Sequence, residues 1–329
     1  MYSIKGKKAE KLEPVTFTEL KMLESDIEEI LRTSIDMLCD DEESMLVVGR
    51  QVKNVMNGRS DLTAVDSNGN IVLIEIKLDR KDIEGRAEAF EFQAIRYAAS
   101  YATIKNLEEL VKKVYAPYIE KYKDEYVKGE LTSYELGVRK LNEFLEANGA
   151  INTFNEKQKI ILAASDYDEQ TLSAVAWLNS NEVDISCYKL IPYKINDEIY
   201  LYADKILPVT EYGDYYVNLM DKTLPNIVAK NKTITRKSLP KINSLIEWGV
   251  VKPGDTIVAK GRDDEATLQA DGNIVANGKE QSMAVWLREL YGWSTVQTYA
   301  FAIHKETGKT LSQMREEYMA KEIEAATEA

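Results

Sequence analysis

Apolar residues recur at helical spacing near the start of the chain. Within residues 16–39 they stand three or four positions apart, at Leu20, Leu23, Ile27, Ile30, Leu31, Ile35 and Leu38. This spacing aligns them along one face, so it predicts an amphipathic helix that packs on a core. A mostly apolar run over residues 44–52 predicts a strand. Residues 83–104 predict a second helix whose shared face carries Phe90, Ala94, Tyr97 and Tyr101.

Two helical stretches follow and predict an insert over about residues 106–157. Pro117 predicts a kink in the first stretch, and Gly149 suits the C-cap of the second. The insert carries no chemistry that we recognise, and a surface for a partner or for self-association is the simplest interpretation. A strand (158–165), a helix (168–181) and two strands (183–206) come next. This order predicts a mixed α/β domain over residues 1–207.

The pattern changes in the last third of the chain. Residues 208–235 lose clear periodicity and are predicted to form a linker. Residues 236–305 predict a small α+β domain with a short helix, a strand, a hairpin that turns at Asp271 and Gly272, a second helix and a final strand over 296–304. Residues 306–329 predict a charged, exposed helical tail.

Composition narrows the classes of protein that this chain can belong to. Among 329 residues, 44% are hydrophobic and 29% charged, and no apolar run approaches the roughly 20 residues that cross a bilayer. There is no signal-peptide pattern, and the two cysteines, Cys39 and Cys187, cannot build a disulfide framework, so a cytoplasmic location fits best. His304 is the single histidine, which argues against His-Cys zinc sites and Ser-His-Asp triads. Hydrolytic chemistry would have to rest on carboxylates, lysine and a hard metal ion.

Net charge bears on possible partners. A formal charge of -13 argues against a protein that coats nucleic acid without specificity. It leaves room for a local basic cleft, because affinity follows the local electrostatic field.

Charged residues stand at the ends of an apolar hairpin over residues 61–77. Asp61 lies at one end, and Glu75 and Lys77 lie at the other. A two-residue Asn-Gly loop would turn Asp61 and Glu75 to opposite faces. A three-residue loop over 67–69, with Gly69 in the left-handed conformation, would pair Asp66 with Asn70 and set Asp61 opposite Glu75, with Lys77 on the same face.

The three-residue loop predicts a metal site. Two opposed carboxylates repel one another, so their pairing favours a bound cation. Mg²⁺ or Mn²⁺ suits such a site, and the carbonyl of Ile76 could complete the metal shell. The ammonium of Lys77 could then orient the attacking water or help to deprotonate it. The alternative for Glu75 and Lys77 is a cross-strand salt bridge.

These residues resemble the PD-(D/E)XK nuclease superfamily, in which Ser60 would replace the motif's proline. The resemblance implies a restriction-endonuclease-like core of a helix, a three-stranded meander, a helix and a further strand. It also implies roles for Gln93, which would orient Lys77 or the phosphate, and for Tyr97, which alternatively belongs to the core. The closest likeness is to the catalytic domain of the archaeal mismatch endonuclease. There Glu28, or less favourably Glu24, would join the metal, the alternative for Glu28 being a solvated helix face.

Residues 238–303 resemble the RAMA domain of restriction enzymes and adenine methylases. The likeness rests on Gly254-Asp255, Ala266-Thr267, Asp271-Gly272, Ser282 and Trp293. It implies that this domain reads DNA. Nine Lys and Arg residues balance eight Asp and Glu residues over 236–305, which is compatible with DNA contact. The candidate phosphate contacts are Lys260, Arg262 and Lys279, for which the alternative is ordinary surface charge. The candidates for stacking on a base are Trp248, Trp286, Trp293 and Tyr299, and for at least two of them an aromatic core is the favoured alternative.

The two resemblances together imply a metal-dependent endonuclease that acts on double-stranded DNA. Its second domain would recognise target or modified DNA, as in restriction or defence. Because a cut through both strands needs two sites, we expect a homodimer. The alternatives are a mismatch-type repair nuclease and a non-catalytic DNA-binding adaptor that keeps the nuclease fold.

Overall fold

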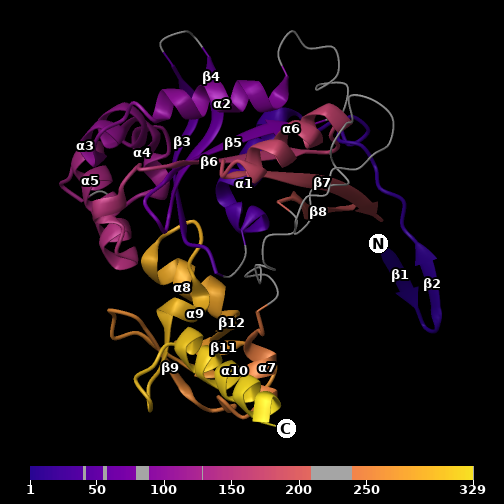
Figure 1. Ribbon diagram of the computed structural model, residues 1–329, viewed down its shortest axis with the longest axis vertical. Coiled ribbons are helices and arrows are strands. Elements are labelled where there is room, and N and C mark those ends of the chain that lie inside the picture. The colour runs from indigo at the N-terminus through magenta and orange to yellow at the C-terminus, as the bar shows by residue number, and fades with distance from the viewer. Residues whose placement is uncertain (40–41, 55–57, 79–88, 128, 209–238, 329) are drawn as a thin grey trace. The chain divides into compact units, whose positions relative to one another are not determined.

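The computed structural model describes residues 1–39, 42–54, 58–78, 89–127, 129–208 and 239–328 (Figure 1). The chain divides into two compact units, Met1–Leu38 with Leu46–Lys232 and Cys39–Met45 with Thr233–Ala329. The segment Cys39–Met45 therefore groups with the second unit, although the sequence analysis placed it in the first domain. Apart from Pro208, the predicted linker over 208–235 lies outside the described residues.

A six-stranded mixed sheet forms the centre of the first unit. Its strands, in spatial order, are β3 (Met45–Lys53), β4 (Arg59–Asp66), β5 (Ile71–Lys77), β6 (Gln158–Ala164), β7 (Ile185–Ile195) and β8 (Glu198–Leu207). The pairs β4–β5 and β7–β8 are antiparallel, whereas β6 runs parallel to β5 and to β7. Every residue of β5 is buried, so the charges at its end lie inside the unit.

The first unit also contains two short N-terminal strands and a series of helices, and these helices follow the predicted order. The elements before the insert and after it are β1 (Tyr2–Lys5), β2 (Lys8–Lys11), α1 (Glu24–Thr33), η1 (Ile35–Leu38), α2 (Phe90–Tyr101) and α6 (Glu169–Ser180). The insert contains α3 (Leu107–Leu110), the π-helical turn η3 (Val111–Tyr115), α4 (Ala116–Lys121), η4 (Lys123–Glu125), α5 (Ser133–Asn148) and η5 (Ile151–Thr153). Its helices α3, α4 and α5 gather at one side of the sheet (Figure 1). The sequence of helix, strand, hairpin, helix, insert, strand, helix and strands confirms the predicted mixed α/β organisation.

The first helix is shorter than its apolar spacing predicts. Only Glu24–Thr33 is α-helical, and Leu23 at its N-cap is 65% exposed. Upstream, Thr16 and Glu19 hydrogen-bond to one another's backbone and side chain, and Lys21 has a φ of 56°. A left-handed residue cannot continue a right-handed helix, so the helix begins only after it. The carboxylate of Asp26 then accepts from the N–H of Leu23 at 2.7 Å and caps the new start.

The second unit is built on a five-stranded antiparallel sheet in the order β12-β11-β10-β9-β13. Its elements are α7 (Ile242–Glu247), β9 (Thr256–Ala259), β10 (Glu265–Leu268), β11 (Ile274–Ala276), β12 (Lys279–Gln281), α8 (Met283–Tyr291), α9 (Thr298–Phe301), β13 (Ala302–His304) and α10 (Leu311–Glu328). The predicted hairpin turns at Asp271 and Gly272, where Gly272 has a φ of 86°. Within the described residues no helix is long and apolar enough to cross a bilayer.

The predicted strand over 296–304 is wrong in its first half. Residues Thr298–Phe301 form the short helix α9, and only Ala302–His304 pair with β9. Tertiary contacts decide this, because the Tyr299 hydroxyl accepts from the N–H of Ile242 at 2.7 Å and Tyr299 is buried. Short apolar runs fit a helix or a strand equally well by periodicity.

Candidate metal centre

The hairpin that carries the charged residues has the three-residue loop. Leu62 pairs with Ile74 and Val65 with Ile71, a register that sets Asp61 opposite Glu75. The N–H of Asp66 donates to the carbonyl of Asn70 at 3.0 Å. Gly69 has a φ of 83°, which other residues rarely adopt. The predicted register is therefore confirmed.

Burial makes the two opposed carboxyl groups costly to ionise. Asp61 is 5% exposed and Glu75 is fully buried. Burial raises the pKa of Asp61, and it raises the pKa of Glu75 further because the charge of Asp61 adds repulsion. The atom Oε1 of Glu75 has no hydrogen-bond partner among the described residues. Added positive charge at this place would favour the ionised form of both groups.

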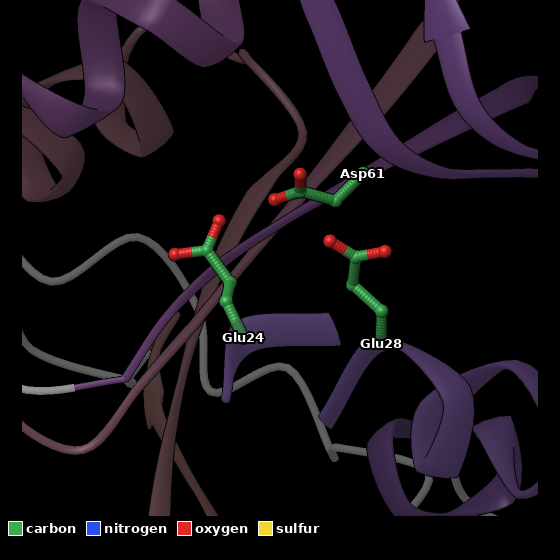
Figure 2. A group of neighbouring side chains, drawn as sticks. All are labelled: Glu24, Glu28 and Asp61. Atoms are coloured by element: carbon green, nitrogen blue, oxygen red, sulfur yellow. The ribbon is translucent and has the colours of Figure 1, made fainter. Parts of the chain in front are cut away.

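Asp61 meets two glutamates of α1. Oxygen atoms of Glu24, Glu28 and Asp61 lie within 4.8 Å of one another. Figure 2 shows the three carboxylates turned toward a common space, two of them projecting from α1 and one from β4. Glu28 is only 3% exposed, so its alternative as a solvated helix face is wrong. Glu24 was the less favoured candidate, yet its i, i+4 spacing from Glu28 was a sequence signal for a shared face.

Glu75 lies outside this acidic triad, which we define as Glu24, Glu28 and Asp61. It remains electrostatically close, because the charges of Asp61 and Glu24 both raise its pKa. The sequence predicts Asp61 and Glu75 as the main metal ligands. The described geometry instead pairs Asp61 with α1, and it places Glu75 beside the triad.

Lys77 faces the same group of carboxylates. Its Nζ lies 3.2 Å from Oε1 of Glu24 and donates to the carbonyl of Ile76 at 2.7 Å. The ion pair that Lys77 forms is thus with Glu24, not the predicted alternative with Glu75. The Ile76 carbonyl keeps a second lone pair, so its predicted place in a metal shell stays a prediction.

Gln93 of α2 contacts both Glu75 and Tyr97. The amide Nε2 of Gln93 lies 3.4 Å from Oε2 of Glu75 and 3.4 Å from the Tyr97 hydroxyl. That hydroxyl accepts from the N–H of Arg59 at 3.0 Å. Tyr97 is half-buried, so it is neither wholly core nor free at the surface. We therefore assign Gln93 a contact with Glu75, and its predicted action on Lys77 or a phosphate stays a prediction.

Arg50 and Gln51, in the second half of β3, were missed by the sequence analysis. Arg50 Nε donates to Oε2 of Glu28 at 3.0 Å. Gln51 Nε2 donates to Oε1 of Glu28, and it also lies 3.2 Å from Oδ1 of Asp61. Gln51 has a φ of 56°, an unusual value for a strand residue and one that occurs more often at functional sites. The only sequence signal was a polar pair within a mostly apolar strand.

The donor set fits a hard divalent cation. The triad offers carboxylate oxygens, the ligands that Mg²⁺ and Mn²⁺ prefer. Among the four carboxylates of Glu24, Glu28, Asp61 and Glu75, Glu24 contacts Lys77 and Glu28 contacts Arg50. If all four ionise, a divalent cation would balance the remaining charge. Glu24, whose side chain is 37% exposed, leaves the site open to solvent on one side.

The predicted DNA contacts of the second unit differ in exposure. Lys260 and Arg262 are exposed beside the aromatic rings of Phe301 and Tyr291, and Lys279 is exposed and pairs with a glutamate. Trp293 is 7% exposed and packs on Tyr291 and Phe301, which disagrees with its predicted stacking on a base. The other aromatic candidates also pack within the protein. Trp286 and Tyr299 are buried, and Trp248 stacks on Tyr318.

The sequence matches no family model. No curated protein matches it significantly.

Proposed function

We propose that this protein is a metal-dependent endonuclease that hydrolyses phosphodiester bonds in DNA. The observation that carries the proposal is the convergence of Glu24, Glu28 and Asp61, with Glu75 and Lys77 beside them. Buried carboxylates in excess of their cationic partners are costly to fold, and such arrangements are typical of sites that bind a cation. The resemblance of Ser60-Asp61 and Glu75-Ile76-Lys77 to the PD-(D/E)XK superfamily supports the choice of a nuclease.

The side chains would divide the work as follows. Glu24, Glu28 and Asp61 would hold Mg²⁺ or Mn²⁺, and Glu75 would add negative charge next to them. When bound, the ion would supply Lewis-acid stabilisation of the charge that develops on the phosphate. Lys77, already 3.2 Å from a triad oxygen, would orient the attacking water and offset negative charge in the transition state. Gln93 would fix the carboxylate of Glu75 through its amide.

Recognition of the substrate would belong to the second unit. Its exposed Lys260, Arg262 and Lys279 would contact phosphates and position the duplex. The likeness to the RAMA domain favours target or modified DNA as the substrate, in restriction or defence. A homodimer would bring two sites to the two strands. Because Asp61, Glu75 and Lys77 are all present, we favour a nuclease over a non-catalytic adaptor.

The test is cleavage of unmodified, modified and mismatched DNA duplexes with Mg²⁺ or Mn²⁺. We expect Lys77→Ala to lower the rate about 10²- to 10⁴-fold, the usual contribution of a residue that acts on the attacking water. Lys189→Ala is the matched control. Lys189 also lies on a strand of the same sheet, β7, but its Nζ pairs with Oδ1 of Asp166 at 2.8 Å. Cleavage that survives Lys77→Ala would overturn the mechanism. Equal cleavage of the three duplexes would overturn the proposed recognition of modified DNA, and a preference for mismatches would favour a repair nuclease.

A further inference from the structure

The helical insert packs against the part of the sheet that leads into the acidic triad. Gly49 of β3 makes this contact possible, because a Cβ there would lie 2.7 Å from Cγ1 of Val114 in η3. The next residue along β3 is Arg50, which binds Glu28. The insert thus touches β3 directly before the residue that contacts the triad.

Arg50 connects the insert to the triad through a set of hydrogen bonds. Its Nη1 donates to the hydroxyl of Tyr122, at 3.0 Å, and to Glu29. Its Nη2 donates to the carbonyl of Ser25 at 2.8 Å, and its Nε donates to Oε2 of Glu28 at 3.0 Å. The guanidinium is planar, so contacts at each of its nitrogens fix its orientation. With its side chain 13% exposed, Arg50 has little freedom to swing away.

We propose that Arg50, held by the Tyr122 hydroxyl of the insert, is a positioning residue that sets the Glu28 carboxylate for the divalent cation. The insert is then a support of the metal site, beyond the association surface that its sequence suggests. The proposal rests on the proposed function only in that the triad binds a cation. It does not depend on the substrate.

The need for positioning follows from the geometry of Glu28. Both of its carboxylate oxygens accept hydrogen bonds, Oε2 from Arg50 and Oε1 from Gln51. These contacts set the plane of the carboxylate and hence the direction of the lone pairs that face Glu24 and Asp61. Hydrogen bonds to a metal-binding side chain orient it and contribute to metal affinity. Their removal typically lowers that affinity 10- to 100-fold. Tyr122 reaches Glu28 only through a second hydrogen bond, the one to Arg50, so we expect its removal to lower metal affinity less.

A second arginine in the same region provides the control. Arg32 Nη1 donates to the hydroxyl of Tyr118 at 3.1 Å, and the guanidinium also binds Glu29 and Glu125. No hydrogen bond is observed between Arg32 and the triad within the described residues. Tyr118 and Tyr122 lie in contact, with ring centroids 4.8 Å apart. Removal of either hydroxyl is the same chemical change in the same segment, but only the Tyr122 hydroxyl binds the arginine that reaches Glu28.

The experiment measures Mn²⁺ binding by calorimetry on the full chain, together with the unfolding temperature in EDTA. We expect Tyr122→Phe to weaken Mn²⁺ binding about three- to tenfold. Tyr118→Phe should stay within about twofold of wild type. Arg50→Lys keeps the positive charge but loses the planar guanidinium with its several N–H donors. It should weaken Mn²⁺ binding at least as much as Tyr122→Phe. In a Glu28→Gln background, Tyr122→Phe should cause no further loss, because the group that it positions is gone.

The outcomes separate this inference from the proposed function. If the wild type binds Mn²⁺ and Tyr122→Phe binds it equally well, the positioning role is overturned and the metal site stands. An equal loss in Tyr118→Phe would show a general effect of the insert and would also overturn it. Tighter binding by Arg50→Lys would show that Arg50 competes with the cation rather than aiding it. A wild type without Mn²⁺ binding would overturn the proposed function and this inference together.

Discussion

In the second unit the buried arginine has a carboxylate partner, whereas in the first unit buried carboxylates outnumber the cations that they contact. Arg315 is 2% exposed, and its Nη1 lies 2.7 Å from Oε1 of Glu42. It also packs 4.7 Å from the ring centroid of Tyr299. Around the triad, Lys77 pairs with Glu24 and Arg50 with Glu28, and among the described residues the buried Asp61 and Glu75 have no ion pair of their own. A balanced buried pair is typical of structure, and an unbalanced group is typical of a site that awaits a ligand.

The largest expected effect tests the balanced side of this comparison. Arg315→Met should destabilise the second unit by about 3–5 kcal/mol, because Glu42 would be left without its buried partner. Urea unfolding followed by tryptophan fluorescence measures this, since Trp248, Trp286 and Trp293 all lie in that unit. Adding Glu42→Gln should restore much of the loss. A single variant as stable as the wild type would show that the pair is not structural.

A pH titration tests the unbalanced side. The folded protein holds protons on Asp61 and Glu75 more tightly than the unfolded chain does, because their pKa values are raised. The resulting stability is fully present below the ordinary carboxyl pKa near 4 and is lost as the pH rises through the raised values. In EDTA we expect the first unit to lose about 2 kcal/mol between pH 5 and pH 9. Hydrogen exchange of the Ile76 amide, which donates to Asp61, reports this unit. A flat profile would contradict the account of buried charge.

In both units, local features could be predicted from the sequence, whereas contacts between distant segments could not. The hairpin register depends on Gly69 and on alternation along two strands, which are local features, so it was predicted correctly. The partner of Asp61 across the unit depends on where α1 packs, and no local pattern specifies that. The same holds for the grouping of Cys39–Met45 with the second unit, where Glu42 binds a residue 273 positions away. Arg50 and Gln51 were missed because their role arises only from tertiary contacts.

Glu75→Gln gives a smaller change with an opposite sign. It replaces a carboxyl group that is costly both to ionise and to keep protonated at pH 8 in this buried place, so in EDTA the first unit should gain about 1 kcal/mol of stability. Added Mn²⁺ should then stabilise the variant less than the wild type, because the negative charge that attracts the ion is reduced. Thermal unfolding with EDTA and with Mn²⁺ measures both effects. A variant that is less stable in EDTA would show that Glu75 serves the fold rather than a ligand.

The smallest effect on stability concerns charges that are neither buried nor in excess. Lys279 and Glu289 form a pair with Nζ and Oε1 2.8 Å apart, and both side chains are more than half exposed. Water and salt screen such a pair, so Lys279→Ala should leave the unfolding midpoint unchanged. If Lys279 contacts a phosphate, the same variant should weaken DNA binding about equally on all sequences. It should also reduce the slope of log affinity against log salt by about 1. An unchanged salt slope would remove Lys279 from the proposed DNA contact and leave it as an ordinary surface charge.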